Sequence, residues 1–151
     1  MKLAHLQQQI TELTSSRDLE WFSGPFSKRI VMLHASISGA ANACRAGKDT
    51  ACTTDLAKLV IQIVAFPAMF PSWGDIWESQ GLDDFRTGDV FCDLWDCLHK
   101  LHQLAASLVG GRSDIILLIK MLQVVCTAAR QYNIDLVKAI KEQMDIYWQT
   151  A

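Results

Sequence analysis

The spacing of the apolar residues constrains the fold of this chain more than any other feature of the sequence. In most segments apolar side chains recur every three or four residues, as on one face of an α-helix, and the alternation typical of β-strands is scarce. All three prolines, Pro25, Pro67 and Pro71, stand between these periodic segments, where they break no helical hydrogen bond. We therefore expect residues 1–151 to form a single all-α domain, a bundle of five to six helices.

The ends of the expected helices follow from residues that start or stop helices. Pro25 is tolerated in a first turn, and Gly47 is a natural stop. Thr53 or Thr54 can cap the helix that follows a turn-like stretch, and Ser113 can cap a later one. The expected helices are residues 2–13, 25–47, 55–66, 85–111, 114–132 and 133–148.

The stretch between the third and fourth expected helices is rich in aromatic residues. Residues 67–83, "PAMFPSWGDIWESQGLD", contain two prolines, two glycines and two tryptophans, and a long loop of this kind is often functional or packed. Two interpretations stay open for Trp73 and Trp77. They form either a lid that stacks on a flat ligand or a cover over the open end of the bundle.

The charge balance excludes several classes of partner. Asp and Glu number 16 and Lys and Arg 14, so the net charge of −2 provides no basic field for nucleic acid or an anionic membrane. Polar glutamines interrupt the N-terminal "MKLAHLQQQITEL", which does not resemble a signal peptide, and the longest apolar runs are too short to cross a membrane. We expect a cytoplasmic protein with no nucleic-acid or membrane partner.

The cysteines agree with a reducing compartment. There are five, an odd number, and they show no C-x-x-C pair of the kind that binds zinc. Cys92 and Cys97 lie near histidines and could suggest a nucleophile, but no orienting Asn or Asp can be assigned to them. Cysteine catalysis is therefore disfavoured.

The first half of the chain resembles a known family. The segment "RDLEWFSGPFSKRIVMLHASISGAANACRAG" is followed after a turn by "DLAKLVIQIVAF", and "NIDLVKAIKEQMD" lies near the end. This order resembles the MazG and dimeric dUTPase superfamily, the all-α nucleoside triphosphate pyrophosphohydrolases. The resemblance covers residues 17–66 well and 127–144 loosely, and it implies a dimer or tetramer.

The resemblance also implies where a metal site would lie. In that family an E-E-x-x-E helix faces an E-x-x-D helix, and their carboxylates hold Mg²⁺, a hard cation that prefers oxygen ligands, against the triphosphate. Only Asp55 keeps a carboxylate at the corresponding positions, and Lys58 places a positive charge where a cation would bind. The three glutamates of the first motif fall on Ala35, Ser36 and Gly39, and the family glutamate that follows them falls on Asn42. The Glu and Asp of the second motif fall on Asp55 and Lys58.

A pocket without the metal could remain between the second and third expected helices. Its polar groups could bind a phosphate or another polar ligand. In the alternative interpretation, Lys58 and Gln62 form the solvent-facing stripe of their helix, and the small residues of the second helix serve close packing. The candidate ligand-binding residues are His34, Ser38, Asn42, Asp55, Lys58 and Gln62.

A second metal hypothesis concerns the fourth expected helix. Asp89, Asp93 and Asp96 recur there at i, i+4 and i+7, with His99 one turn further. The same spacing fits a solvated polar face opposite an apolar stripe, which is the preferred interpretation. We expect His34, His99 and His102 to pack between helices, because they lack the spacing of a zinc site.

Three functions follow from these observations. The preferred one is a catalytically degenerate MazG-like protein that binds a nucleotide, another small polar ligand or a protein partner, with no cofactor. The second is an active Mg²⁺-dependent pyrophosphohydrolase with relocated carboxylates. The third is a helical adaptor with no small ligand. The helix of residues 114–132 is apolar around most of its girth, which predicts a central position or a homo-oligomer interface.

Overall fold

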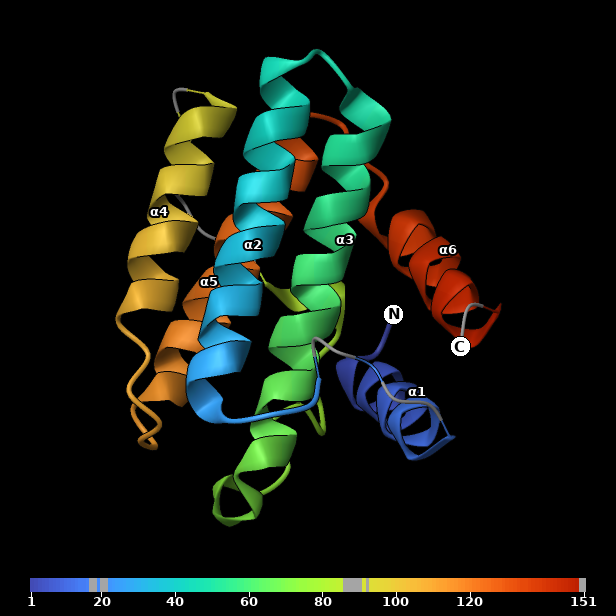
Figure 1. Ribbon diagram of the computed structural model, residues 1–151, viewed down its shortest axis with the longest axis vertical. Helices are drawn as coiled ribbons and strands as arrows, with labels where there is room; N and C mark the ends of the chain where they lie inside the picture. Colours follow the sequence, from blue (N-terminus) through green and yellow to red (C-terminus); the bar gives the residue numbers. More distant parts are fainter. Residues whose placement is uncertain (17–18, 20–21, 86–90, 92, 150–151) are drawn as a thin grey trace.

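The computed structural model describes residues 1–16, 19, 22–85, 91 and 93–149, and this part of the chain is an all-α bundle (Figure 1). The predicted fold class is therefore confirmed. The only β-type pairing among the described residues is an isolated bridge between Lys2 and Gly81. The α-helices are α1 (Leu3–Ser16), α2 (Phe26–Arg45), α3 (Asp49–Ala65), α4 (Leu94–Ala106), α5 (Asp114–Gln131) and α6 (Leu136–Gln149), and the short 3₁₀ helices are η1 (Phe66–Met69), η2 (Pro71–Trp73) and η3 (Leu82–Asp84).

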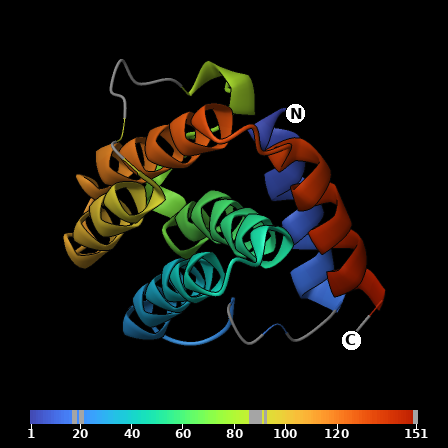
Figure 2. The same ribbon diagram turned by 90° about the horizontal axis from the view of Figure 1, so that it is seen from above.

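Helix α3 is the centre of the bundle. It packs against α1, α2, α5 and α6, whereas α4 packs against α2 and α5. Figure 2 shows α1 and α6 together on one side of α3. The stretch Asp49–Met69 has the length and hydropathy of a membrane span, but 67% of its most apolar window is buried inside the bundle. Such burial is what the core helix of a bundle shows. Helix α5, for which the sequence predicts either a central position or a homo-oligomer interface, leaves Ile116 exposed on its outer face.

The turn between α2 and α3 is shorter than predicted. Gly47 adopts a φ of +72°, its N–H donates to the Cys44 carbonyl at 3.1 Å, and the Lys48 N–H donates to the Ala43 carbonyl at 2.8 Å. These two bonds form a Schellman motif, which closes the turn within three residues. Helix α3 consequently starts at Asp49, and the prediction that residues 48–54 form a turn is wrong.

The start of α4 also differs from the prediction. The helix begins at Leu94, because Asp93 has an extended backbone and its Oδ1 accepts a hydrogen bond from the Asp96 N–H at 2.9 Å. Asp93 is therefore the N-cap of α4. It does not belong to a helical face that would start at residue 85.

Both tryptophans of the aromatic segment pack into the bundle. Trp77 is fully buried, and its Nε1 donates to the Val64 carbonyl at 3.0 Å. Trp73 is also buried and stacks on Phe70 with 4.2 Å between ring centroids. This placement favours the interpretation that these rings cover the end of the bundle.

Candidate functional site

A cavity of about 300 Å³ lies where α2, α3 and α6 meet. Three of the predicted ligand-binding residues, Asp55, Lys58 and Gln62, line it together. Their spacing of three and four residues places them on one face of α3. The remaining lining residues are Met32, Ala35, Ser36 and Tyr147.

Asp55 lies close to the backbone of α2. A β-carbon at Gly39 would come within 2.8–2.9 Å of the Asp55 carboxyl atoms, so the glycine leaves the space that this carboxyl occupies. Burial raises the pKa of Asp55 above its ordinary value, and the charge of Lys58 opposes that rise. A half-buried carboxyl thus faces the cavity from α3.

Neither charged group of the cavity is neutralised by a close partner. Asp55 and Lys58 lie one helical turn apart, yet no ion pair within 4.0 Å and no hydrogen bond joins either side chain to another described residue. The two charges therefore remain available to a ligand. Each would gain from a partner of opposite sign, because a half-buried charge is poorly solvated.

Gln62 is the most informative residue of the cavity. Its side chain is 8% exposed, and its Nε2 donates to the Ser36 hydroxyl at 2.9 Å. Its Oε1 is buried and has no hydrogen-bond partner in the described part of the protein. Turning the amide over would only exchange which of the two atoms lacks a partner. A buried unpaired amide atom costs about 1–3 kcal/mol, so its presence calls for an explanation.

Tyr147 closes the cavity from α6. Its phenol bonds with the side chain of Gln143, and burial raises its pKa to about 12. The phenol is therefore protonated at neutral pH. Tyr147 is not among the residues predicted for the site, but its position could be found from the sequence: Ile140, Gln143, Met144 and Tyr147 recur at helical spacing and indicate one inward face.

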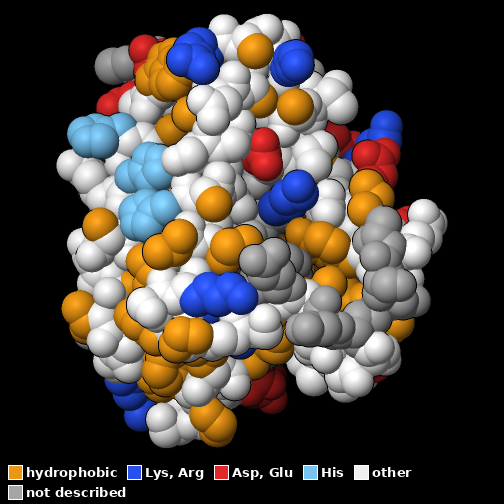
Figure 3. Space-filling view, viewed as in Figure 1, with side chains coloured by type: hydrophobic (Ala, Val, Ile, Leu, Met, Phe, Trp, Pro, Cys, Tyr) orange, Lys and Arg blue, Asp and Glu red, His pale blue; other side chains and the backbone are white. Residues whose placement is uncertain are grey.

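The other predicted site residues lie elsewhere. Ser38 and Asn42 are exposed on α2 and do not line the cavity. His34 faces α4, where its Nδ1 lies 2.7 Å from the Nδ1 of His102 and the two rings stack. Burial, followed by the charges of His34 and His99, lowers the pKa of His102. Figure 3 shows the histidines gathered along one edge of the face that carries α2 and α4.

The acidic residues of the fourth segment do not form a metal site in the described part of the chain. Asp93 uses its carboxylate to cap α4, and Asp89 lies outside the described residues. Among the residues that the structure describes, no group of three or more His, Cys, Asp or Glu side chains could hold a metal ion. The cavity itself offers Mg²⁺ one carboxylate and an opposing ammonium, which is a poor donor set for a hard dication.

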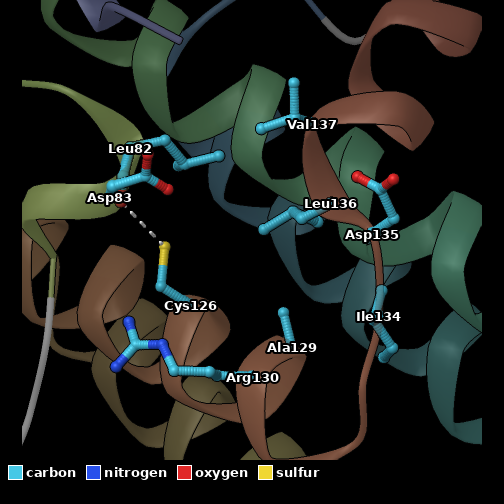
Figure 4. Close-up of a pocket in the computed structure, with 9 residues that line it drawn as sticks. All are labelled: Leu82, Asp83, Cys126, Ala129, Arg130, Ile134, Asp135, Leu136 and Val137. Carbon is cyan, nitrogen blue, oxygen red and sulfur yellow. Dashed lines mark hydrogen bonds between the residues drawn. The ribbon is translucent and has the colours of Figure 1, made fainter.

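A second cavity, of about 210 Å³, lies between η3, the end of α5 and the start of α6 (Figure 4). Its walls combine apolar residues with Asp83, Arg130 and Asp135, and its thiol and one of its carboxylates already have partners. The Cys126 thiol contacts the Leu82 carbonyl at 3.6 Å, and Asp135 Oδ1 accepts from the Lys138 N–H at 3.2 Å. These groups serve the fold, and the cavity at α2, α3 and α6 is the stronger candidate for a polar ligand.

The buried cysteines are unsuited to catalysis. Burial raises the pKa of Cys97 and of Cys126 to about 12, so neither carries a thiolate at neutral pH. We expect iodoacetamide at pH 8 to modify both at least about 100-fold more slowly in the native protein than in denaturant, as measured by peptide mass spectrometry. Fast native modification of Cys97 would contradict its position in the core. Cys92 lies outside the described residues.

Comparison of the chain with protein-family models, with curated proteins and with solved structures finds no match. The resemblance to the MazG-like superfamily therefore rests on the quoted sequence segments alone.

Proposed function

We propose that this protein binds a small polar ligand in the cavity between α2, α3 and α6, without metal-dependent hydrolysis. The observation that carries the proposal is the unpaired amide of Gln62, which is buried in the wall of this cavity. Asp55 and Lys58 add two charges that have no close partner among the described residues. A ligand that bonds to Asp55 and Lys58 would offset the cost of leaving them unpaired, and a turn of the Gln62 side chain toward the ligand would do the same for its buried amide oxygen.

The cavity is open to solvent, so its size determines how much of a ligand it can hold. Liquid water occupies about 30 Å³ per molecule, so a cavity of about 300 Å³ has room for about ten non-hydrogen atoms. A phosphate or a small metabolite fits inside. A nucleotide would be held by one part only, with the rest in solvent.

The resemblance to the MazG-like superfamily enters as a proposal of ancestry. Four of the positions onto which it maps the family's carboxylates line this one cavity, and a fifth, Gly39, adjoins the Asp55 carboxyl. This coincidence supports a degenerate relative that kept the pocket. The exchange of a carboxylate for Lys58 opposes metal binding there. The four lining positions are Ala35, Ser36, Asp55 and Lys58.

Ligand binding and catalysis can be tested together. The probes are inorganic phosphate, a panel of nucleoside triphosphates and a library of small polar metabolites, each with and without Mg²⁺. We expect at least one probe to raise the melting temperature without Mg²⁺ and no nucleotide to release pyrophosphate. The variant Lys58→Met should lose the effect, whereas Lys100→Met, on the exposed face of α4, should keep it.

Two results would overturn the proposal. Pyrophosphate release that requires Mg²⁺ and Asp55 would establish the enzyme instead. If no probe changes the melting temperature, the adaptor hypothesis replaces it. The exposed apolar residues Trp95, Val109 and Ile116 would then be the first surface to test.

We expect Gln62 to lower the stability of the fold and to support ligand binding. The variant Gln62→Met keeps the volume of the side chain and removes the unpaired amide, while the Ser36 hydroxyl can bond to a carbonyl of its own helix. We expect the free energy of unfolding in urea to rise by about 1 kcal/mol and ligand binding to be lost. Gln123→Met, at a half-buried position of α5, should change neither. A loss of stability in Gln62→Met would show that the amide serves the fold.

A further inference from the structure

We infer that the ligand is a small zwitterion of amino-acid size, whose cationic amine meets Asp55 and whose anionic group meets Lys58. This inference rests on the proposed function, because it names the class of ligand for the same cavity. It depends on how the two opposite charges are placed, and on the neutral groups that surround them.

The two charges are close enough for one small molecule to reach both, and they form no direct ion pair with each other. They are three residues apart on α3, which corresponds to a rise of about 4.5 Å along the helix. No ion pair within 4.0 Å forms between them, although both line the same cavity. The cavity therefore presents a negative and a positive group side by side.

This arrangement discriminates between classes of ligand. A simple anion such as phosphate would be attracted by Lys58 and repelled by Asp55. A simple amine would be attracted by Asp55 and repelled by Lys58. In a half-buried site both effects are stronger than in water. A zwitterion alone places an opposite charge against each group, so it should bind more tightly than either of its halves.

The position of Asp55 is built into the packing of α2 on α3. Gly39 leaves room for the carboxyl, which any larger residue there would displace. The raised pKa of Asp55 reflects the burial that this packing imposes. An ammonium group from a ligand would stabilise the ionised carboxylate and relieve that cost.

The rest of the cavity suits the remainder of an amino acid. Gln62 and Ser36 form a neutral hydrogen-bonding corner one turn beyond Lys58, and the Gln62 amide there has an unpaired atom. Met32 and Ala35 supply an apolar wall for a short side chain. A volume of about 300 Å³ accommodates about ten non-hydrogen atoms, the size of a small amino acid.

Isothermal titration calorimetry with matched probes tests the inference. The probes are the proteinogenic amino acids, the corresponding amines without the carboxylate, the corresponding acids without the amine, and inorganic phosphate. We expect at least one amino acid to bind about tenfold or more tightly than either of its halves. In Asp55→Asn its affinity should fall about tenfold, while binding of the matched acid is unchanged or tighter. In Lys58→Met the affinity for both the amino acid and the acid should fall.

The outcomes separate this inference from the proposed function. If phosphate or a nucleotide binds in a Lys58-dependent manner and no amino acid binds more tightly than its halves, the inference is overturned and the proposed function stands. If none of these probes binds, the inference is overturned, and the proposed function is decided by the nucleotides and polar metabolites of the melting-temperature experiment. The exposed substitution Asp96→Asn controls for a general effect of net charge, and urea unfolding of each variant shows that it is folded. Equal loss of both ligand types in Asp55→Asn would also contradict the assignment of Asp55 to the amine.

Discussion

Replacing Trp77 with alanine is expected to lower the free energy of unfolding by about 4 kcal/mol. Trp77 is the largest side chain among the fully buried ones, and it meets the Phe85 ring edge-on with 6.1 Å between centroids. Its loss would leave a large cavity and would remove the donor to the Val64 carbonyl, one of the last carbonyls of α3. Urea denaturation followed by circular dichroism measures the effect.

A matched variant separates the two contributions. Trp77→Phe keeps most of the apolar surface but cannot donate to Val64, so a loss of about 1–2 kcal/mol is expected. Ligand binding should be unchanged in this variant, because Trp77 does not line the cavity between α2, α3 and α6. Loss of ligand binding in Trp77→Phe with full stability would revive the lid hypothesis. A change below 1 kcal/mol in Trp77→Ala would contradict the packing described above.

The helices were predictable because apolar periodicity is a local property. The residues at which α3 and α4 start were not predictable, since each start depends on a specific hydrogen-bond pattern. The hydrogen bonds of Gly47 and Lys48 close the turn between α2 and α3 early. Residues 49–54 therefore form the start of α3, although their sequence is typical of a turn. Asp93 looks like a member of a polar helical face, but an extended backbone makes it the cap of α4. Sequence spacing alone does not distinguish a capping aspartate from one on a helical face.

The residues that line the candidate site could be predicted from the sequence on α3, and only in part on α2. Helix α3 has a nearly continuous apolar surface, so its polar positions stand out in the sequence. Helix α2 packs against two helices, α3 and α4, and its sequence does not show which inward face meets which neighbour. His34 was expected at α3 and instead meets His102 of α4, while Ser36 turns toward Gln62.

The proposed binding site is formed largely by polar residues of α3, the most buried helix. A helix that is buried on all sides is stabilised by apolar residues, and α3 follows this rule from Leu59 to Ala65 except at Gln62. Consistency between burial and polarity holds in most of a natural protein, and exceptions concentrate at functional sites. The exception at Gln62 lies in the wall of a cavity that also holds two charges with no ion-pair partner in the described part of the chain. The one polar residue in this apolar stretch of α3 therefore lies at the proposed binding site.

Not every buried polar residue has a ligand to bind, and Asp114 provides the contrast. Asp114 is 0% exposed at the start of α5, but its carboxylate accepts from the Val109 N–H at 3.1 Å and from the Gly110 N–H at 2.7 Å. It thereby holds the turn in which Gly110 adopts a φ of +83°. We expect Asp114→Ala to lower the free energy of unfolding by about 3 kcal/mol, because two N–H groups lose their acceptor. Urea unfolding measures the loss.

Asp114→Asn keeps one acceptor oxygen and removes the charge that favours the N-terminus of α5, so it should lose about half as much stability. Amide hydrogen exchange should show faster exchange at Val109 and Gly110 in both variants, with the larger change in Asp114→Ala. If Asp114→Ala were as stable as the native protein, its carboxylate would be dispensable for the fold. The hydrogen bonds of Asp114 would then not mark it as a structural carboxylate in contrast to Asp55. Ligand binding should be retained in Asp114→Asn and reduced in Asp55→Asn, since only Asp55 lines the cavity.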